Sequence, residues 1–250
     1  MEEKANNWQI IRLPETVSTN LYLRELLKEG APADKTVVTA QFQLAGRGQQ
    51  GNSWFADKGK NLLFSILIYP ENIVAKEQFG ISRIVSLAVK KTLDRYVEDI
   101  RVKWPNDIYW RDKKMGGILI ENNLQGNYIQ SSTIGIGLNI NQDDFPQTLP
   151  NPVSLKQVAG VDLDRNTVLD QVLHEFFDLY GRLAQGGASS IEEEYMKSLY
   201  RAEGFHWFED SGGRFQAKIE DVRPSGHLVL VTPDKKEERV YAFKEVQFIL

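Results

Sequence analysis

The chain has 250 residues, and its 42% hydrophobic and 26% charged side chains are typical of a globular protein that can bury a sizeable core. Its formal net charge of −4 gives no basic excess of the kind that attracts nucleic acid or an anionic membrane. Because the sequence contains no cysteine, it excludes disulfides, thiolate metal sites, iron–sulfur clusters and a cysteine nucleophile.

Neither a secretory signal nor a membrane span is expected. The start, Met1-Glu2-Glu3-Lys4, lacks the apolar run of a signal peptide. The longest apolar stretch, Leu62 to Tyr69, is interrupted by Ser65 and is much shorter than the ~20 residues of a membrane-spanning helix. We therefore expect a soluble, cytoplasmic protein.

The first part of the chain alternates helical and extended patterns. The polar residues Ser18-Thr19-Asn20 precede a leucine-rich stretch that ends at Gly30, which predicts a helix. Apolar residues recur at helical spacing between Ala75 and Val97, which predicts a second helix. Apolar and β-branched runs predict strands at residues 36–39, 62–69, 101–104, 108–110, 118–121 and 129–140. The turn Gln125-Gly126-Asn127 joins the last two strands in a predicted hairpin.

The second part begins with a proline-rich loop around Pro146 and ends in a strand-rich segment. Asn166 is expected to cap a helix with an apolar stripe from Val168 to Leu183, and a shorter helix follows at residues 191–200. From Glu203 onward, alternating apolar residues and turns predict a small SH3-like β-barrel.

A glycine-rich segment, Gly46-Arg47-Gly48-Gln49-Gln50-Gly51, fits the pattern G-x-G-x-x-G. A dinucleotide-binding loop requires a helix directly afterwards, but residues 52–59 are rich in turns and have no helical stripe. A protein kinase requires H-R-D and D-F-G strings, and neither occurs. Two interpretations remain: a surface turn, or a flexible loop whose N–H groups and Arg47 surround an anionic group.

Further along, polar residues and glycines are concentrated in three short strings. Lys103-Trp104-Pro105-Asn106-Asp107 predicts either a plain corner between strands or a site for a polyphosphate with its Mg²⁺. Lys114 precedes Gly116-Gly117, and Gly135-Ile136-Gly137-Leu138-Asn139 alternates glycine with apolar residues. Glycines in a strand mark either a bulge or a place where a ligand approaches the backbone closely.

With these strings in this order, the sequence resembles that of biotin–protein ligase from about residue 8 to residue 250. The strings that carry the resemblance are Ser18-Thr19-Asn20, Gln43 before the Gly46–Gly51 loop, Lys103 to Asp107, Lys114 with Gly116-Gly117, and Gly135 to Asn139. Because only seventeen residues precede Ser18, the chain is similar to the short form of the family, without the DNA-binding winged helix of its repressor members.

The resemblance implies an α+β fold with a mixed-sheet catalytic domain of the biotin/lipoate ligase type at residues 1–200, followed by the SH3-like barrel at residues 203–250. It implies a ligase that uses ATP and Mg²⁺ to form biotinyl-5′-AMP from biotin. The enzyme then transfers biotin to a lysine of a biotin carboxyl carrier domain. No DNA and no membrane partner is expected, and both a monomer and a homodimer remain open.

The resemblance also assigns roles to individual residues. Lys114, Arg47 and Asp107 are implied to be catalytic, with Asp107 contacting magnesium through the phosphates. The implied biotin contacts are Ser18, Thr19, Asn20, Gln43, Arg47, Gly48, Gln49, Lys114, Gly117, Gly135 and Gly137. The implied nucleotide contacts are Gly46, Arg47, Gly48, Gln49, Trp54, Asn106 and Asn139. Gln49 departs from the family, many members of which have a second arginine at this position, and so weakens the expected hold on the adenylate.

Three other functions compete with a biotin–protein ligase. A lipoate ligase or octanoyltransferase shares the fold, but those enzymes lack a G-R-G-x-x-G loop combined with K-W-P-N-D. A non-catalytic biotin-binding regulatory module has no need for Arg47, Asp107 and Lys114 together. Nucleic-acid binding by the barrel is disfavoured because residues 203–250 contain seven Lys or Arg against nine Asp or Glu.

Overall fold

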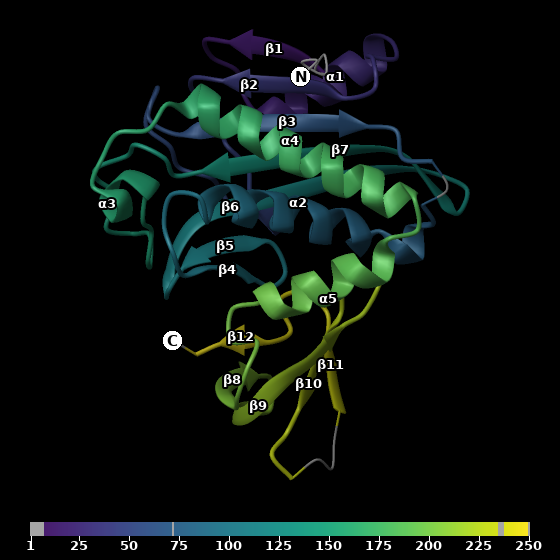
Figure 1. Ribbon diagram of the computed structural model, residues 1–250, viewed down its shortest axis with the longest axis vertical. Coiled ribbons are helices and arrows are strands. Elements are labelled where there is room, and N and C mark those ends of the chain that lie inside the picture. The colour runs from purple at the N-terminus through teal and green to yellow at the C-terminus, as the bar shows by residue number, and fades with distance from the viewer. Residues whose placement is uncertain (1–7, 72, 235–237, 250) are drawn as a thin grey trace, which may run out of the picture. The chain divides into compact units, whose positions relative to one another are not determined.

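The computed structural model in Figure 1 describes residues 8–71, 73–234 and 238–249. The Met1-Glu2-Glu3-Lys4 start, where no secretory signal is expected, lies outside these residues. The chain forms two compact units, of which the first comprises Met1–Ala75 with Met115–Leu169 and the second Lys76–Lys114 with Asp170–Leu250. The boundary between residues 1–200 and 203–250 stays a prediction.

The first unit is built on a mixed sheet. Its strands follow one another in the order β1 (Gln9–Leu13), β2 (Thr36–Ala40), β3 (Leu62–Ile68), β7 (Tyr128–Leu138) and β6 (Lys113–Gln125) (Figure 1). The pair β1–β2 is parallel, whereas the other pairs are antiparallel. The predicted mixed sheet and the predicted β6–β7 hairpin are therefore confirmed.

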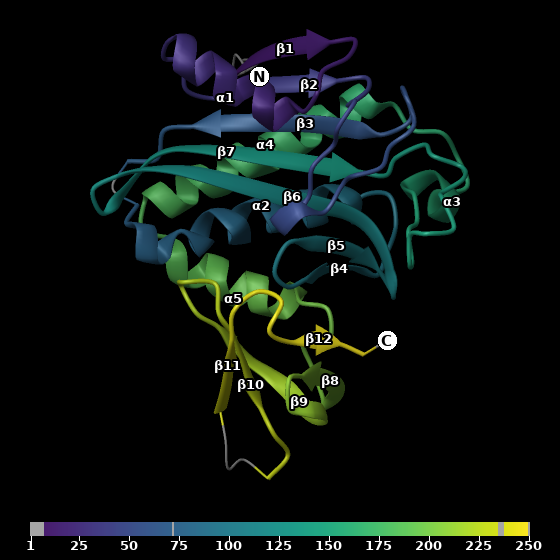
Figure 2. The ribbon, with the colours of Figure 1, turned by 180° about the vertical axis from the view of Figure 1, so that it is seen from behind.

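The strand register determines which residues share a face. Ser65 of β3 lies opposite Gly135 of β7, which lies opposite Leu119 of β6. Two residues further along each strand, the next row on the same face consists of Leu67, Thr133 and Glu121. The helix α1 (Thr19–Glu29) lies on this face (Figure 2). It contacts β2, β3 and β7 and packs Leu23 against Val38 and Leu67. The N-terminus of α1 thereby reaches Gly135 of β7 through Asn20.

The second unit combines helices with a small antiparallel sheet. It holds α2 (Phe79–Leu93), the strand pair β4 (Ile100–Lys103) and β5 (Asp107–Trp110), most of α4 (Arg165–Ala184), and α5 (Ala188–Ser198). Its five-stranded sheet has the order β11 (Glu238–Tyr241), β10 (Leu228–Val231), β9 (Gly213–Val222), β8 (His206–Asp210) and β12 (Gln247–Phe248). This all-antiparallel sheet is compatible with the predicted SH3-like barrel. None of the described helices is long and apolar enough to span a membrane.

Some local predictions were wrong. The predicted cap of α4, Asn166, lies inside the helix, and the side chain of Asp164 accepts hydrogen bonds from the N–H groups of Asn166 and Thr167 instead. A carboxylate is an equally good cap, so sequence alone did not separate the two candidates. The short elements β1 and α3 (Leu155–Ala159) were not predicted, because polar Gln9 and Arg12 interrupt the apolar residues of β1 and because the five residues of α3 are too few for a helical period.

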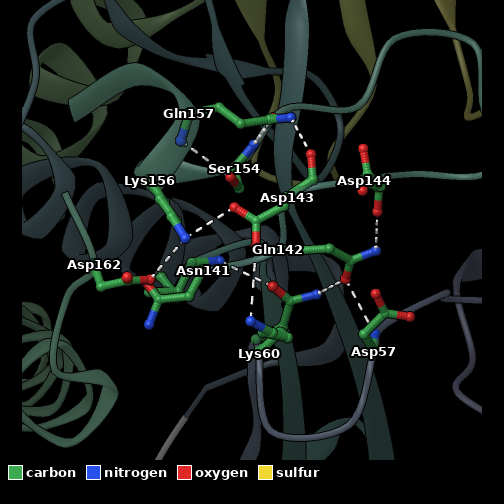
Figure 3. A network of polar contacts seen from close by, with 12 residues as sticks. Asp57, Lys60, Asn141, Gln142, Asp143, Asp144, Ser154, Lys156, Gln157 and Asp162 are labelled. Atoms are coloured by element: carbon green, nitrogen blue, oxygen red, sulfur yellow. Dashed lines mark hydrogen bonds and ion pairs between the residues drawn. The ribbon is translucent and has the colours of Figure 1, made fainter. Parts of the chain in front are cut away.

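A polar network fixes the loop that follows β7 (Figure 3). Gln142, which is 0% exposed, accepts hydrogen bonds through Oε1 from the Asp57 N–H and from Asn61 Nδ2. Its Nε2 donates to the Asp144 carbonyl at 2.8 Å. Asn61 Oδ1 in turn accepts from the Ile140 N–H at 3.0 Å. Two buried amides therefore tie the segment after the glycine-rich loop to the segment after β7.

The outer part of this network is ionic (Figure 3). The Lys156 ammonium lies 2.9 Å from Asp143 and 3.1 Å from Asp162. The hydrogen bond from Lys156 lowers the pKa of Asp143, and the same bond raises the pKa of Lys156. The contribution of the Asp143 carboxylate to the stability of the fold is present above the ordinary carboxyl pKa, and it is lost as the pH falls through the lowered pKa. The stabilising contribution of the Lys156 ammonium is present below the ordinary lysine pKa, and it is lost as the pH rises through the raised pKa. Both contributions are therefore present at neutral pH.

The substitution Gln142→Leu is expected to lower the free energy of unfolding by about 1–3 kcal/mol, because the buried amide of Asn61 loses its acceptor. Urea denaturation followed by circular dichroism measures this loss. Gln147→Leu is the matched control, since Gln147 is exposed in the same loop and its replacement should change stability by about 0.5 kcal/mol or less. Equal losses in the two variants would contradict a structural role for Gln142.

Candidate functional site

A cluster of uncharged polar side chains surrounds the start of α1. Ser18, Thr19 and Asn20 are 3%, 4% and 3% exposed. The Thr19 N–H and hydroxyl donate to Gln43 Oε1 at 2.8 and 3.1 Å. The Ser65 hydroxyl lies 2.6 Å from both Thr19 Oγ1 and Asn20 Oδ1. Four residues predicted to line a biotin pocket thus come together, and Ser65 of β3 joins them.

Asn20 extends the cluster toward the glycine-rich loop. Its Nδ2 donates to the Leu119 carbonyl at 3.2 Å and to Glu121 Oε2 at 2.8 Å. The other oxygen of that carboxylate, Glu121 Oε1, lies 3.4 Å from Arg47 Nη2. A continuous series of polar contacts therefore connects six residues, in the order Gln43, Thr19, Ser65, Asn20, Glu121 and Arg47.

The glycines of β7 form the floor beneath these side chains. A Cβ at Gly135 would overlap Asn20 Oδ1, so any larger residue there would displace the Asn20 amide. A Cβ at Gly137 would lie 2.6 Å from Trp54 Cε2, so the indole packs directly on the backbone of β7. Gly117 of β6 is the cross-strand partner of Gly137. The sequence predicted close approach of a ligand at these glycines, and at Gly135 and Gly137 the side chains of Asn20 and Trp54 make a close approach.

The glycine-rich loop is a closed turn. The Trp54 N–H donates to the Gly46 carbonyl at 2.9 Å, Arg47 and Ser53 form an antiparallel bridge, and the Gly48 N–H donates to the Asn52 carbonyl at 2.6 Å. A Cβ at Gly46 would lie 2.5 Å from the Trp54 carbonyl oxygen, so glycine is required there. A 3₁₀ turn at Gln49–Gly51 closes the tip. In the described residues, β3 is the next element after this turn, and no α-helix opens from the loop as a dinucleotide-binding loop would require.

Gln49 differs from its neighbours in the loop. Its side-chain oxygen Oε1 is buried and has no hydrogen-bond partner within the described part of the chain. A buried amide oxygen without a donor costs free energy, which a ligand or water donor recovers. Gln49 is therefore placed to contribute a hydrogen bond, although it cannot contribute the charge of an arginine.

Asn139 lies just beyond the end of β7 and is 4% exposed. Its Nδ2 donates to the Val153 carbonyl at 3.2 Å, and its N–H donates to the Met115 carbonyl at 2.9 Å. Asn139 thus also anchors the loop that Figure 3 shows.

In the second unit, a lysine and an aspartate of the predicted set form a close ion pair. Lys114 Nζ lies 2.7 Å from Asp107 Oδ1, with the two side chains 35% and 21% exposed. Asn106 is half-buried in the turn before Asp107. The carboxylate therefore holds the lysine ammonium in a defined position, while the Lys114 side chain as a whole is partly exposed.

Lys103 has a different environment from the one that its motif suggests. Its Nζ lies 4.5 Å from the centre of the Tyr109 ring and 5.4 Å from that of Phe248, and it donates to the Tyr109 hydroxyl at 3.0 Å. Trp104, which precedes Pro105 in a cis peptide, donates through Nε1 to the Gly226 carbonyl at 2.8 Å. Lys103 and Trp104 thus pack within the second unit, and Asp107 is the member of the motif that meets Lys114.

The predicted site residues fall into two groups. The first unit holds Ser18, Thr19, Asn20, Gln43, Gly46, Arg47, Gly48, Gln49, Trp54, Gly117, Gly135, Gly137 and Asn139. The second holds Asn106, Asp107 and Lys114.

Sequence reasoning missed Ser65 and Glu121. Ser65 is 0% exposed and is the polar residue in an otherwise apolar buried strand, which was the available signal. Glu121 belongs to the row next to Gly135, but that row is visible only once the strand register is known.

Magnesium was predicted to contact Asp107. Among the described residues, no group of three or more His, Cys, Asp or Glu side chains is placed to hold a metal ion. Asp107 offers one carboxylate, which already bonds to Lys114. Such a donor fits Mg²⁺ that takes most of its ligands from phosphates and water.

Comparison with known proteins agrees with this geometry. The family model for the biotin/lipoate A/B protein ligase family matches residues 12–139. Bifunctional ligase/repressor BirA of Bacillus spizizenii is 34% identical over 227 residues, which are 87% of this chain and 67% of that protein. BirA of Escherichia coli is 34% identical over 166 residues, and the aligned part covers 65% of this chain and 50% of that protein. The chain thus spans about half the length of the E. coli relative.

A solved structure of biotin protein ligase from Aquifex aeolicus, in complex with biotin and ATP, has the same fold. It superimposes with a TM-score of 0.79 at 24% identity and covers 96% of this chain and 99% of that one. The family match extends over half of the sequence, and it includes the start of α1, the glycine-rich loop and the glycines of β7. The chain belongs to the biotin/lipoate A/B protein ligase family.

Proposed function

We propose that this protein is an ATP-dependent biotin–protein ligase, which forms biotinyl-5′-AMP and transfers biotin to a lysine of a biotin carboxyl carrier domain. The observation that carries the proposal is the buried uncharged cluster of Thr19, Asn20, Gln43 and Ser65, which extends through Glu121 to Arg47. Hydroxyls and amides suit the ureido ring of biotin, which has two N–H donors and one carbonyl acceptor. A cation at the end of the cluster suits a carboxylate or phosphate.

The proposed reaction has two steps. The biotin carboxylate attacks the α-phosphorus of ATP and expels pyrophosphate, and a lysine amine then attacks the mixed anhydride and releases AMP. Both steps develop negative charge near one phosphate, so positioning and electrostatic stabilisation dominate catalysis. We assign Lys114 to the oxygens shared by carboxylate and α-phosphate, with Asp107 as the group that positions it.

The nucleotide is assigned to the glycine-rich loop and to polar residues of both units. Backbone N–H groups from Gly46 to Gln49 and the Arg47 guanidinium are suited to phosphate oxygens. Trp54 provides a flat apolar surface, and Asn106 and Asn139 are the proposed polar contacts. When bound, Mg²⁺ would offset the charge of the phosphates, with Asp107 as its protein ligand.

The proposed partner is the carrier domain of a biotin-dependent carboxylase. A Mycobacterium tuberculosis relative, 28% identical over 68% of this chain, has the name biotin–[acetyl-CoA-carboxylase] ligase. The E. coli and B. spizizenii relatives are named ligase/repressors, but the acidic charge of this chain does not favour DNA as a partner. We also propose a cytoplasmic location, which the absence of cysteine favours.

The direct test is incubation of the protein with biotin, ATP, Mg²⁺ and a biotin carboxyl carrier domain, followed by intact-mass analysis of the carrier. Addition of one biotinyl group is expected, and it should require ATP. Parallel reactions with lipoate and octanoate separate the related activities of the family. Transfer of lipoate or octanoate in place of biotin would overturn the proposal.

The substitution Lys114→Ala should slow pyrophosphate release by about 100-fold or more, because it removes a cation from the charge that develops in the first step. Lys113→Ala is the matched control, since Lys113 is the exposed neighbour on the same strand and should leave the rate nearly unchanged. Thermal unfolding of both variants checks that the fold is intact. Similar rates for the two variants would show that Lys114 does not have the assigned role.

Arg47 and Gln49 should differ in how strongly they hold the adenylate. A charge-assisted hydrogen bond is worth about 1.5–3 kcal/mol and a neutral one about 0.5–1.5 kcal/mol. We therefore expect Arg47→Ala to speed dissociation of biotinyl-AMP by about 10-fold or more, and Gln49→Ala by about 10-fold or less. Stopped-flow tryptophan fluorescence measures both rates. A larger effect at Gln49 would mean that its buried amide, rather than Arg47, is the main contact of the loop.

A further inference from the structure

Glu121 is a carboxylate within a site that is proposed to bind anions. Among the first-unit site residues described above, Arg47 is the cation and Glu121 is the anion, so their formal charges cancel. Without Glu121, the same set of residues would have a net charge of +1, which would attract the biotin carboxylate and the phosphates. The following argument rests on the proposed function.

Each oxygen of the Glu121 carboxylate has its own partner. Oε2 accepts from Asn20 Nδ2 at 2.8 Å, and Oε1 lies 3.4 Å from Arg47 Nη2. The first contact is short and involves the buried Asn20. The second is longer, and its two side chains are 43% and 31% exposed. The carboxylate is therefore firmly held on the Asn20 side and loosely bound to Arg47.

A long, half-exposed ion pair contributes little free energy, because water solvates both charges. Such a pair can exchange for another. A ligand carboxylate or phosphate that reaches Arg47 offers the same charge as Glu121 and competes with it for the guanidinium. Because Asn20 holds the Glu121 carboxylate, Glu121 stays beside the loop after the ligand has displaced it from Arg47.

We propose that Glu121 is an internal competitor for Arg47, which limits how tightly the site holds the ligand anion. Glu121 positions the Arg47 guanidinium over the β6–β7 surface, and the ion pair between them dissociates when a ligand anion binds Arg47. Its effect is to weaken binding of the carboxylate form of biotin and to speed release of the adenylate. Glu121 is thus a residue that sets affinity for the charged end of the ligand.

The substitution Glu121→Gln isolates the charge, because the amide oxygen still accepts from Asn20 and the side chain keeps its size. Isothermal titration calorimetry with biotin should give a dissociation constant about 2- to 5-fold lower than that of the parent protein, which is the range of an exposed ion pair. Biotinamide, whose side chain ends in an uncharged amide, should bind parent and variant equally. The comparison of these two ligands is the central measurement.

Two controls complete the experiment. Glu25→Gln makes the same change in net charge at an exposed position of α1, and it should leave both dissociation constants unchanged. In an Arg47→Ala background, Glu121→Gln should have no further effect on biotin binding, because the group for which Glu121 competes is gone.

The outcomes separate this inference from the proposed function. If Glu121→Gln weakens both ligands equally, Glu121 only positions Asn20, and if it changes neither, Glu121 does not compete. Either result overturns the inference and leaves the proposed function in place. If the parent protein binds neither biotin nor biotinamide, the proposed function is wrong and this inference is wrong with it.

Discussion

The Asn20 amide lies on the backbone of Gly135, and this contact connects most of the first unit's site. The sheet order places β7 between β3 and β6, so Gly135 lies between Ser65 and Leu119. Because Gly135 has no side chain, the amide rests on the middle strand and bonds to residues of both outer ones. Strands two apart are separated by about 10 Å, a distance that one amide bridges only from directly above the middle strand. The helix N-terminus, three strands and, through Glu121, the glycine-rich loop are thereby joined.

This contact also explains which parts of the site the sequence predicted. The glycines, the Ser18-Thr19-Asn20 string and Arg47 stand out as short local patterns, and the structure connects Gly135, Asn20 and Arg47 through direct contacts and Glu121. The sequence gives no direct sign that Asn20 rests on Gly135, because more than a hundred residues separate the two. Glu121 was missed for the same reason, since the pairing of β6 with β7 decides that it belongs beside Asn20.

The fold shows a similar division between local and distant information. Strands β2 and β3 were predicted closely because β2 is rich in β-branched residues and β3 is largely apolar, and both are buried along their whole length. Strand β1 was missed because its five residues include the exposed polar Gln9 and Arg12, and the other three are only half-buried. Lys103 shows the limit for side chains. Its motif suggested a phosphate site, but its ammonium group lies against the rings of Tyr109, on the adjacent strand, and of Phe248, which is far away in the sequence.

The two cations assigned to ligand anions, Arg47 and Lys114, are each paired with a carboxylate of the chain, but the pairs differ. Lys114 and Asp107 are 2.7 Å apart, which is a direct charge-assisted hydrogen bond and restricts the ammonium to one position. Arg47 and Glu121 are 3.4 Å apart and more exposed, so that guanidinium is free to exchange partners. A group that acts on the reacting atoms benefits from a fixed position, because misplacement lowers the rate steeply. A group on a loop that admits and releases a ligand benefits from a weak partner, so the difference between the two pairs matches the different tasks assigned to them.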